Sequence, residues 1–365
     1  MVFPDAVPTW ALFAEMALAA AVVVLAGWRF ARLADLVADR LHLGAGWIGL
    51  ILLATVTSLP ELVTSGTATL LGNVDLALGG ILGSCSFNIT IIFLLNAAWG
   101  GGSVLTRTDE GRAHTLSSAF GMLLIGLTLF GMVLMDKFAA APKTAGIVEL
   151  CWALLILIAY LFCMKLIHRY ERRRNHADHR DAGPPGRMGA GLTLDLIVTA
   201  AVLIAASWWL ANLGDALSIH PIEWLGGPLG ATFVGACFLA LATSLPEIAT
   251  SISAVKIGKL DLALGNIFGS NMFNIVIIPV LKGLSLGGGH AVMLTPHASD
   301  TTQNLIAGLL AMLLTAVAIG GMAYRSHTRI GRFGFDSILI AAIYLGGMAL
   351  LVTGTPGAAA SVASP

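Results

Sequence analysis

Two glutamates occur in matching contexts far apart in the chain: Glu61 lies in the segment TSLPEL and Glu247 in the segment TSLPEI. Each is near the middle of a long apolar stretch, where a carboxylate is costly unless it is paired, protonated or hydrated. A single acid of this kind could be a protonated or hydrogen-bonded structural group. Two acids in equivalent places instead favour a functional site inside a membrane.

Oxygen-bearing side chains surround both glutamates. The proline before each glutamate removes a backbone donor and frees a carbonyl about four residues earlier. In the next apolar stretch of each segment, Ser and Asn are four residues apart, which places them on one helical face. Small polar residues also stabilise the packing of one helix against another, and this structural role is a credible alternative for the serines alone. The candidate ligands beside the glutamates are Thr57, Ser58, Ser84, Asn88, Thr243, Ser244, Ser270 and Asn274.

This set of ligands consists of oxygen atoms, which suits hard cations such as Ca²⁺, Na⁺ and Mg²⁺. Cys85 is the only thiol in the two segments, and neither segment contains a histidine. Two glutamates carry up to two negative charges, which one Ca²⁺ or a few Na⁺ could neutralise in turn. Competition for one set of oxygens is a simple physical basis for the exchange of one cation for another.

The two glutamates belong to a long internal repeat. Residues 54–91 and 240–277 align without a gap at an offset of 186, and 22 of the 38 positions are identical. The identities include the polar residues as well as Leu and Ala, so shared apolar composition does not explain them. The repeat therefore predicts two structurally equivalent units.

The composition predicts a membrane protein with many spans. Of the 365 residues, 57% are hydrophobic and 11% are charged, and the 20 Lys and Arg balance the 20 Asp and Glu. A soluble protein carries about 25% charged residues, and zero net charge excludes a chain-wide basic nucleic-acid binder. Ten stretches are long and apolar enough for transmembrane helices, namely 8–28, 45–71, 76–98, 116–135, 145–165, 191–213, 228–255, 261–281, 303–323 and 335–353.

Charge asymmetry orients the ten predicted helices. With the N-terminus outside, 17 of the 20 Lys and Arg residues fall on the cytoplasmic side, and only Lys137, Lys143 and Lys282 fall outside, in agreement with the positive-inside rule. Both termini are then outside. Because each half has five helices, an odd number, the second repeat enters the membrane from the opposite side. Such inverted repeats are typical of secondary transporters, which bind substrate where the repeats meet.

The predicted fold is therefore all-α, with two inverted five-helix repeats at residues 1–165 and 191–353. The segment 166–190 between them is polar and basic. It is predicted to be a cytoplasmic linker that anchors the topology, with contact to anionic lipid as the alternative. Residues 354–365 are expected to form a flexible tail.

Other residues are assigned structural roles. Asp75 and Asp261, in short loops before the third and eighth helices, are expected to cap helix N-termini. Glycines in the repeat are expected to allow close helix approach, namely Gly79, Gly83, Gly265 and Gly269. The histidines are expected to be solvated, and four acids receive little functional weight because they have no partner in the repeat, namely Glu15, Glu149, Asp195 and Asp336. The four cysteines have no zinc-site or disulfide-framework spacing.

These motifs resemble the two alpha repeats of the sodium/calcium exchanger family, in the cation/calcium exchanger superfamily. The segments that carry the resemblance are SLPEL at 58–62, TSLPEI at 243–248, DLALG at 75–79 with GSCSFN at 83–88, and DLALGNIFGSNMFN at 261–274. The resemblance implies a prokaryotic-type exchanger in the cell (inner) membrane. The large cytoplasmic Ca²⁺-sensing domain of animal exchangers has no room in the short central linker.

The resemblance further implies electrogenic Na⁺/Ca²⁺ antiport by alternating access, with one ion cluster at the membrane centre and no cofactor. The implied ligands are the two glutamates, the Thr, Ser and Asn side chains named above, and the backbone oxygens of Ala54 and Ala240. Asn274 replaces the Asp of K⁺-carrying members, which argues against K⁺ dependence. The first repeat departs from the family pattern at Gly80 and Cys85, whereas the second keeps Asn266 and Asn271.

Several alternatives stay open at this level. H⁺ could replace Na⁺ as the coupling ion, because either glutamate could be protonated when no metal is bound, and another divalent cation could replace Ca²⁺. A cation channel would need a continuous polar pore, whereas the repeat predicts an occluded site that alternates between two faces. An enzyme is disfavoured, because the sequence has no H-E-x-x-H, Ser-His-Asp or paired-aspartate motif.

Overall fold

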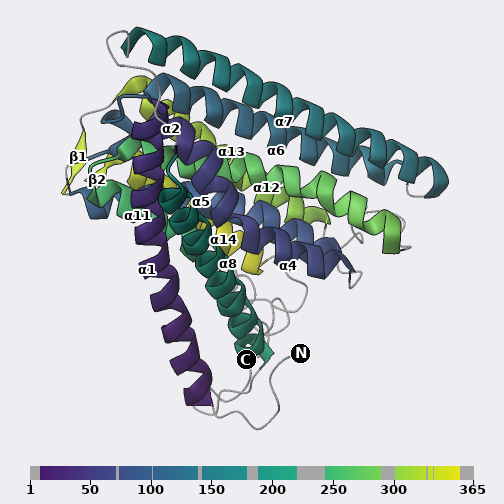
Figure 1. Ribbon diagram of the computed structural model, residues 1–365. Helices are drawn as coiled ribbons and strands as arrows, with labels where there is room; N and C mark the ends of the chain where they lie inside the picture. The colour runs from purple at the N-terminus through teal and green to yellow at the C-terminus, as the bar shows by residue number, and fades with distance from the viewer. Residues whose placement is uncertain are drawn as a thin grey trace.

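The computed structural model describes residues 9–70, 74–100, 102–138, 142–178, 188–219, 243–288, 301–325, 328–331 and 333–353. Helices form nearly all of this part of the chain (Figure 1), and a two-stranded antiparallel hairpin is the exception. The elements are α1 (Thr9–Leu41), α2 (Ala45–Ile48), η1 (Gly49–Leu53), α3 (Ala54–Thr57), α4 (Leu59–Leu70), α5 (Val74–Trp99), η2 (Val104–Thr106), α6 (Gly111–Asp136), α7 (Pro142–Asp178), α8 (Ala190–Ile219), α11 (Leu245–Lys256), α12 (Leu260–Gly288), α13 (Thr301–Tyr324), β1 (Arg329–Ile330), β2 (Phe333–Gly334) and α14 (Phe335–Thr353).

Seven of the described helices are long and apolar enough to cross a membrane, namely α1, α5, α6, α7, α8, α12 and α13. The broken helix from α2 to α4 makes an eighth span if its two bent halves count as one. α14 is apolar but shorter, and the predicted stretch 228–255 is described only from residue 243 onwards. The predicted multi-pass membrane architecture is confirmed, with seven or eight candidate spans in the described residues, and the count of ten stays a prediction.

Two helices continue well beyond their predicted apolar stretches. α1 extends to Leu41, so the basic residues that follow position 28 lie on a helix and not in a loop. Residues 166–178 of the predicted linker likewise continue α7. Arg, Glu and Leu are good helix formers in water, whereas hydropathy marks only the apolar part of a helix. Residues 179–187, the tail 354–365 and the side chain of Asp75 lie outside the described part of the chain.

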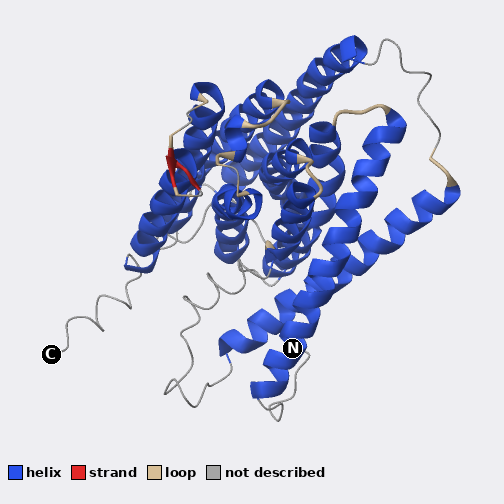
Figure 2. Ribbon diagram, turned by 90° about the vertical axis from the view of Figure 1, so that its left-hand side faces the viewer, coloured by secondary structure: helices blue, strands red, loops and turns tan. Residues whose placement is uncertain are grey.

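The repeat helices α5 and α12 are the most buried of the candidate spans, and α1, α7 and α8 are the least buried. α1 and α8 pack side by side, at an angle to α6, α7, α12 and α13 (Figures 1 and 2). Large apolar side chains project from the outer helices, such as Leu25 (65% exposed), Ile158 (63%) and Leu194 (63%). This exposure suits a surface that faces lipid.

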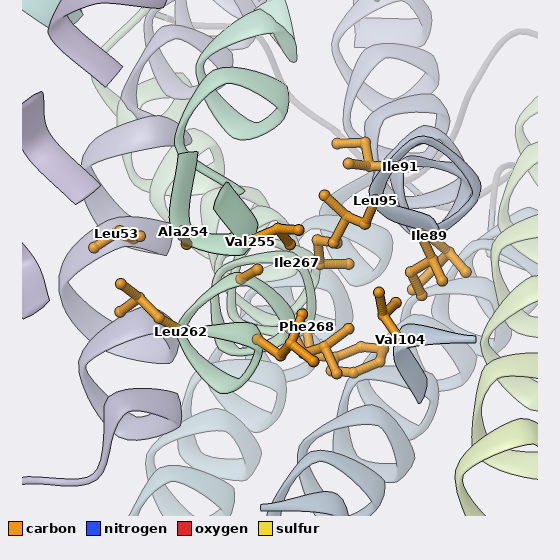
Figure 3. Close-up of a cluster of buried hydrophobic side chains, with 14 of the residues drawn as sticks. Leu53, Ile89, Ile91, Leu95, Val104, Ala254, Val255, Leu262, Ile267 and Phe268 are labelled. Carbon is orange, nitrogen blue, oxygen red and sulfur yellow. The ribbon is translucent and has the colours of Figure 1, made fainter. Parts of the chain in front are cut away.

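The centre of the molecule combines apolar packing with close backbone contact. Figure 3 shows Leu262, Ile267 and Phe268 of α12 among buried side chains from several other helices. A Cβ atom added at Gly265 would lie 2.2 Å from the Gly46 carbonyl oxygen, so the close approach predicted there is confirmed. Gly83 has no such neighbour among the described residues.

Candidate ion-binding site

Two equivalent helix breaks position the candidate ligands. The first is at Ser58, where the segments Ala45–Thr57 and Leu59–Leu70 meet at 41°. Ser58 has φ −89° and ψ 6°, and Ser244, directly before α11, has φ −91° and ψ 4°. In both copies a proline follows in the first helical turn, where the helix needs no N–H donor. Each break therefore places a glutamate in the first turn of a new helix.

Glu247 receives hydrogen bonds from both repeats. Its Oε1 atom accepts the hydroxyl of Ser58, from the first break, at 3.1 Å, and the hydroxyl of Ser270, from α12, at 3.4 Å. The Thr57 hydroxyl also lies near this carboxylate. Glu247 is fully buried, so the two halves of the chain meet at one charged group in the interior.

Glu61 has a different environment. It is 3% exposed, and neither carboxylate oxygen has a hydrogen-bond partner from another residue in the described part of the chain. It lies close enough to Glu247 for the two carboxylates to interact electrostatically. A buried polar group without a partner costs about 1–3 kcal/mol, and more when it is charged. Native structures retain such groups chiefly where they have a task.

The two asparagines of the repeat are also buried without conventional hydrogen bonds. Asn88 on α5 and Asn274 on α12 are both fully buried, and their amide oxygens and nitrogens have no partner at normal distance among the described residues. The Cys85 thiol lies near the Asn274 side chain and within electrostatic range of Glu61. Asn274 and the first glutamate therefore lie in one region around Cys85, and amide and carboxylate oxygens fit a hard cation.

The hydroxyl candidates lie at the breaks and on the repeat helices. Thr57 Oγ1 is 3.4 Å from Ser270 Oγ and 3.4 Å from the carbonyl oxygen of Ala54, which also accepts the Ser58 N–H at 3.1 Å. The Ser244 hydroxyl is buried and has no partner among the described residues. The remaining predicted side chains, Ser84 and Thr243, are buried as well. The backbone ligand predicted at Ala240 lies outside the described residues.

Asn266 and Asn271, two further buried amides of α12, were not among the predicted ligands, although the sequence marks both as positions where the two copies differ. Asn266 bonds to hydroxyls on both sides of the site, including that of Thr57 at 3.3 Å. Asn271 Nδ2 donates to the Cys85 carbonyl at 2.9 Å. The sequence marks these two positions only by a difference between the copies, because the first repeat has Gly80 and Cys85 there.

Asp261 was predicted to cap its own helix, and this prediction is wrong. Its carboxylate accepts the Glu110 N–H at 3.0 Å and the Thr108 hydroxyl, both at the start of α6, and it lies 3.0 Å from His114 Nε2. His114 is 2% exposed, so it is not a solvated histidine. Potential metal-ligand atoms of Glu110, His114 and Asp261 lie within 4.8 Å of one another. Glu110 also accepts the Gly46 N–H at 3.0 Å, so these groups form a bonded junction of three helix starts.

Two of the acids given little weight form ion pairs. Lys282 Nζ lies 2.7 Å from Glu149 Oε2, with both side chains almost completely buried. Lys282 was predicted in an outer loop, but it lies within α12, and its charge is tolerated there because a carboxylate on α7 pairs with it. Asp195 accepts three hydrogen bonds of 2.7–3.1 Å from Arg29 on the exposed surface between α8 and α1.

Comparison with known proteins finds one matching family and several similar membrane proteins. The family model described as sodium/calcium exchanger protein matches residues 11–167 and 192–353. The inner membrane protein YrbG of Escherichia coli is 30% identical over 294 residues, which are 78% of this chain and 80% of YrbG. The putative antiporter CaxA of Alkalimonas amylolytica is 29% identical over 80% of this chain and 85% of its own length. The sodium/calcium exchanger MaX1 of Methanosarcina acetivorans is 27% identical over 70% and 77%.

Solved structures with the same fold include the sodium-calcium exchanger NCX_Mj soaked with Na⁺ and Sr²⁺. The TM-score is 0.64 at 16% sequence identity, and the match covers 93% of this chain and 98% of that one. At this identity the likeness concerns the arrangement of the helices.

Proposed function

The chain belongs to the sodium/calcium exchanger protein family, and we propose that it is an antiporter that exchanges Ca²⁺ for Na⁺ by alternating access. One observation carries the proposal: two buried carboxylates from the two repeats lie within electrostatic range of each other, and the oxygens of one of them have no hydrogen-bond partner from another described residue. A buried cation would supply what these oxygens lack. Ca²⁺ and Na⁺ both prefer oxygen ligands.

The proposed ligands are the two glutamates with the hydroxyl and amide groups around them. Glu247 would bind through the oxygen that Ser58 and Ser270 leave available, and Glu61 through either oxygen. Asn88 and Asn274 would contribute amide oxygens. The hydroxyl ligands would be Thr57, Ser58, Ser84, Thr243, Ser244 and Ser270, and the carbonyl ligands Ala54 and Ala240.

We also propose ten spans in two inverted repeats, with both termini outside and with domains at 1–165 and 191–353. The matching backbone angles at Ser58 and Ser244 support two equivalent units. Equivalent positions Cys85 and Asn271 contact each other in both directions, since the Asn271 amide donates to the Cys85 carbonyl and the Cys85 thiol approaches the Asn271 carbonyl at 3.8 Å. Such mutual contact is expected where a two-fold axis passes between two repeats.

A Ca²⁺/H⁺ antiporter is the second candidate. The observation that favours it is the electrostatic contact between Glu61 and Glu247 in the buried interior. Two carboxylates that interact in a buried site disfavour each other's charged form when no cation is present, so a proton could take the place of Na⁺ on the return step. A channel would not need this alternation of occupants.

Transport by the purified protein in lipid vesicles tests the proposal. Vesicles loaded with Na⁺ and diluted into Na⁺-free medium should take up radiolabelled Ca²⁺, and vesicles loaded with K⁺ should not. Uptake that follows only an imposed pH gradient would support the H⁺ mechanism and reject Na⁺ coupling.

The same assay tests the site. Glu247→Gln removes the charge but keeps the shape of the side chain, and it should nearly abolish Ca²⁺ uptake. Glu15→Gln is the matched control, because Glu15 is an acid of α1 outside the aligned segments 54–91 and 240–277, and uptake should stay close to that of the unaltered protein. Near-normal uptake by Glu247→Gln would refute the assigned site.

A further inference from the structure

Asn266 is a fully buried amide that connects three segments around the site. Its Nδ2 atom lies 3.0 Å from Thr250 Oγ1 and 2.9 Å from Ser251 Oγ, both on α11. Its Oδ1 atom lies 3.3 Å from Thr57 Oγ1, at the end of α3. Asn266 itself belongs to α12, so a single side chain holds a hydroxyl of the first repeat against two helices of the second.

The hydrogen bonds of Thr250 determine which way the Asn266 amide is oriented. The Thr250 hydroxyl lies 2.8 Å from the Pro246 carbonyl oxygen, which can only accept. The single hydroxyl proton is therefore used there, and Thr250 presents lone pairs to Asn266. The amide nitrogen must face Thr250, and the amide oxygen must face Thr57.

The orientation of Asn266 determines what Thr57 offers to the site. Asn266 Oδ1 can only accept, so its contact with Thr57 uses the Thr57 hydroxyl hydrogen. The Ala54 carbonyl at 3.4 Å and the Glu247 carboxylate also only accept, and they compete for this hydrogen. A cation held by Glu247 would repel the hydrogen, which would then point to Asn266 Oδ1 and leave the Thr57 lone pairs facing the ion.

We propose that Asn266 is a positioning residue that makes Thr57 a cation ligand. The Asn266 amide oxygen accepts the hydrogen bond of the Thr57 hydroxyl. The Thr57 oxygen then faces the ion with its lone pairs and not with its hydrogen. The inference rests on the proposed function, because it assigns Asn266 a role in binding the transported ion. At the equivalent position the first repeat has Gly80, which has no side chain to orient Thr243.

A double-mutant cycle on Ca²⁺ binding tests this role. Binding of Ca²⁺ alone is measured calorimetrically on the purified full-length protein in detergent. Asn266→Ala should weaken binding about three- to tenfold, the effect of about one buried hydrogen bond. In the Thr57→Val background, which has no hydroxyl to orient, the same substitution should change binding by less than about twofold.

The matched control is Asn96→Ala. Asn96 is also fully buried and accepts one hydrogen bond, from the Val104 N–H, but it lies at the far end of α5 from the repeat motif. This variant should bind Ca²⁺ as the unaltered protein does. Asn266→Ser, which shortens the side chain but keeps it polar, serves as the second variant if Asn266→Ala does not fold.

Two results would overturn the role of Asn266. The first is equal weakening of Ca²⁺ binding by Asn266→Ala with and without the Thr57 hydroxyl, since a general loss of packing acts in both backgrounds. The second is unchanged binding in Asn266→Ala itself. A complete lack of Ca²⁺ binding by the unaltered protein would instead refute the proposed function together with this inference, so the two failures are distinguishable.

Discussion

Gly269 lies where α12 comes closest to the helix that leads into the first break, and Ala at this position is expected to push the two apart. A Cβ atom there would lie 2.4 Å from the Leu50 carbonyl oxygen and 2.7 Å from Ala54 Cβ. Carbon atoms in contact prefer about 3.5–4.0 Å. The two segments would therefore separate by about 1 Å, because backbone and a short side chain cannot turn away.

The expected cost combines two opposing effects. Overpacking of a dense core costs about 1–3 kcal/mol, while Gly→Ala inside a helix gains about 0.5–1 kcal/mol. The net destabilisation is then centred on about 1 kcal/mol, within a range of about 0–2.5 kcal/mol. The next residue, Ser270, is 3.4 Å from both Glu247 Oε1 and Thr57 Oγ1. A shift of about 1 Å would take both contacts beyond hydrogen-bond distance, so Ca²⁺ binding should weaken as well.

Thermal unfolding of the purified protein, with and without Ca²⁺, measures both effects. Gly269→Ala should unfold at a lower temperature and should gain less from added Ca²⁺. Gly66→Ala is the matched control, because a Cβ atom there would meet Leu284 and Leu281 at ordinary distances of 3.8 and 3.9 Å. It should be as stable as the unaltered protein or more so. Equal behaviour of the two variants would refute the close packing inferred here.

Two other expectations concern charge and orientation. Glu149→Gln should destabilise the protein by about 3–5 kcal/mol, because it leaves the Lys282 charge without its carboxylate; Glu149→Leu with Lys282→Met should recover most of this loss, and a double variant no more stable than the single one would contradict the argument. For orientation, a cysteine at Lys137 in a cysteine-free background should react with an impermeant thiol reagent from outside, and one at Arg173 only after permeabilisation. The opposite labelling pattern would reverse the proposed topology.

The candidate site could be predicted from the sequence because the two copies share identical polar residues, which are rare in an apolar chain. Leu and Ala match by composition alone, but a matched Glu61 and Glu247, each after Ser-Leu-Pro, do not. Both helix breaks follow from the same motif, since proline is accommodated where a helix begins. The multi-pass membrane class follows from charge content and the length of the apolar stretches.

The pairings of the other charged groups were not accessible from sequence. Lys282 and Glu149 are 133 residues apart, and a hydropathy pattern places each near a span end without indicating that they meet. Asp261 stands where a helix cap is expected, but its partners come from the start of α6. Asn266 was visible only as a difference between the copies, and its role depends on the direction of hydrogen bonds, which residue spacing does not reveal.

The helix ends at the first break bear on how a bound cation would be held. α4 carries Glu61 in its first turn, where a helix end contributes about half a positive elementary charge. α3 ends at the same break, and its end contributes a similar negative charge. The two partial charges nearly cancel, so the helix ends would leave the charge of the carboxylate almost undiminished for a cation. A broken helix would thus supply ligand atoms without weakening the field that holds the ion.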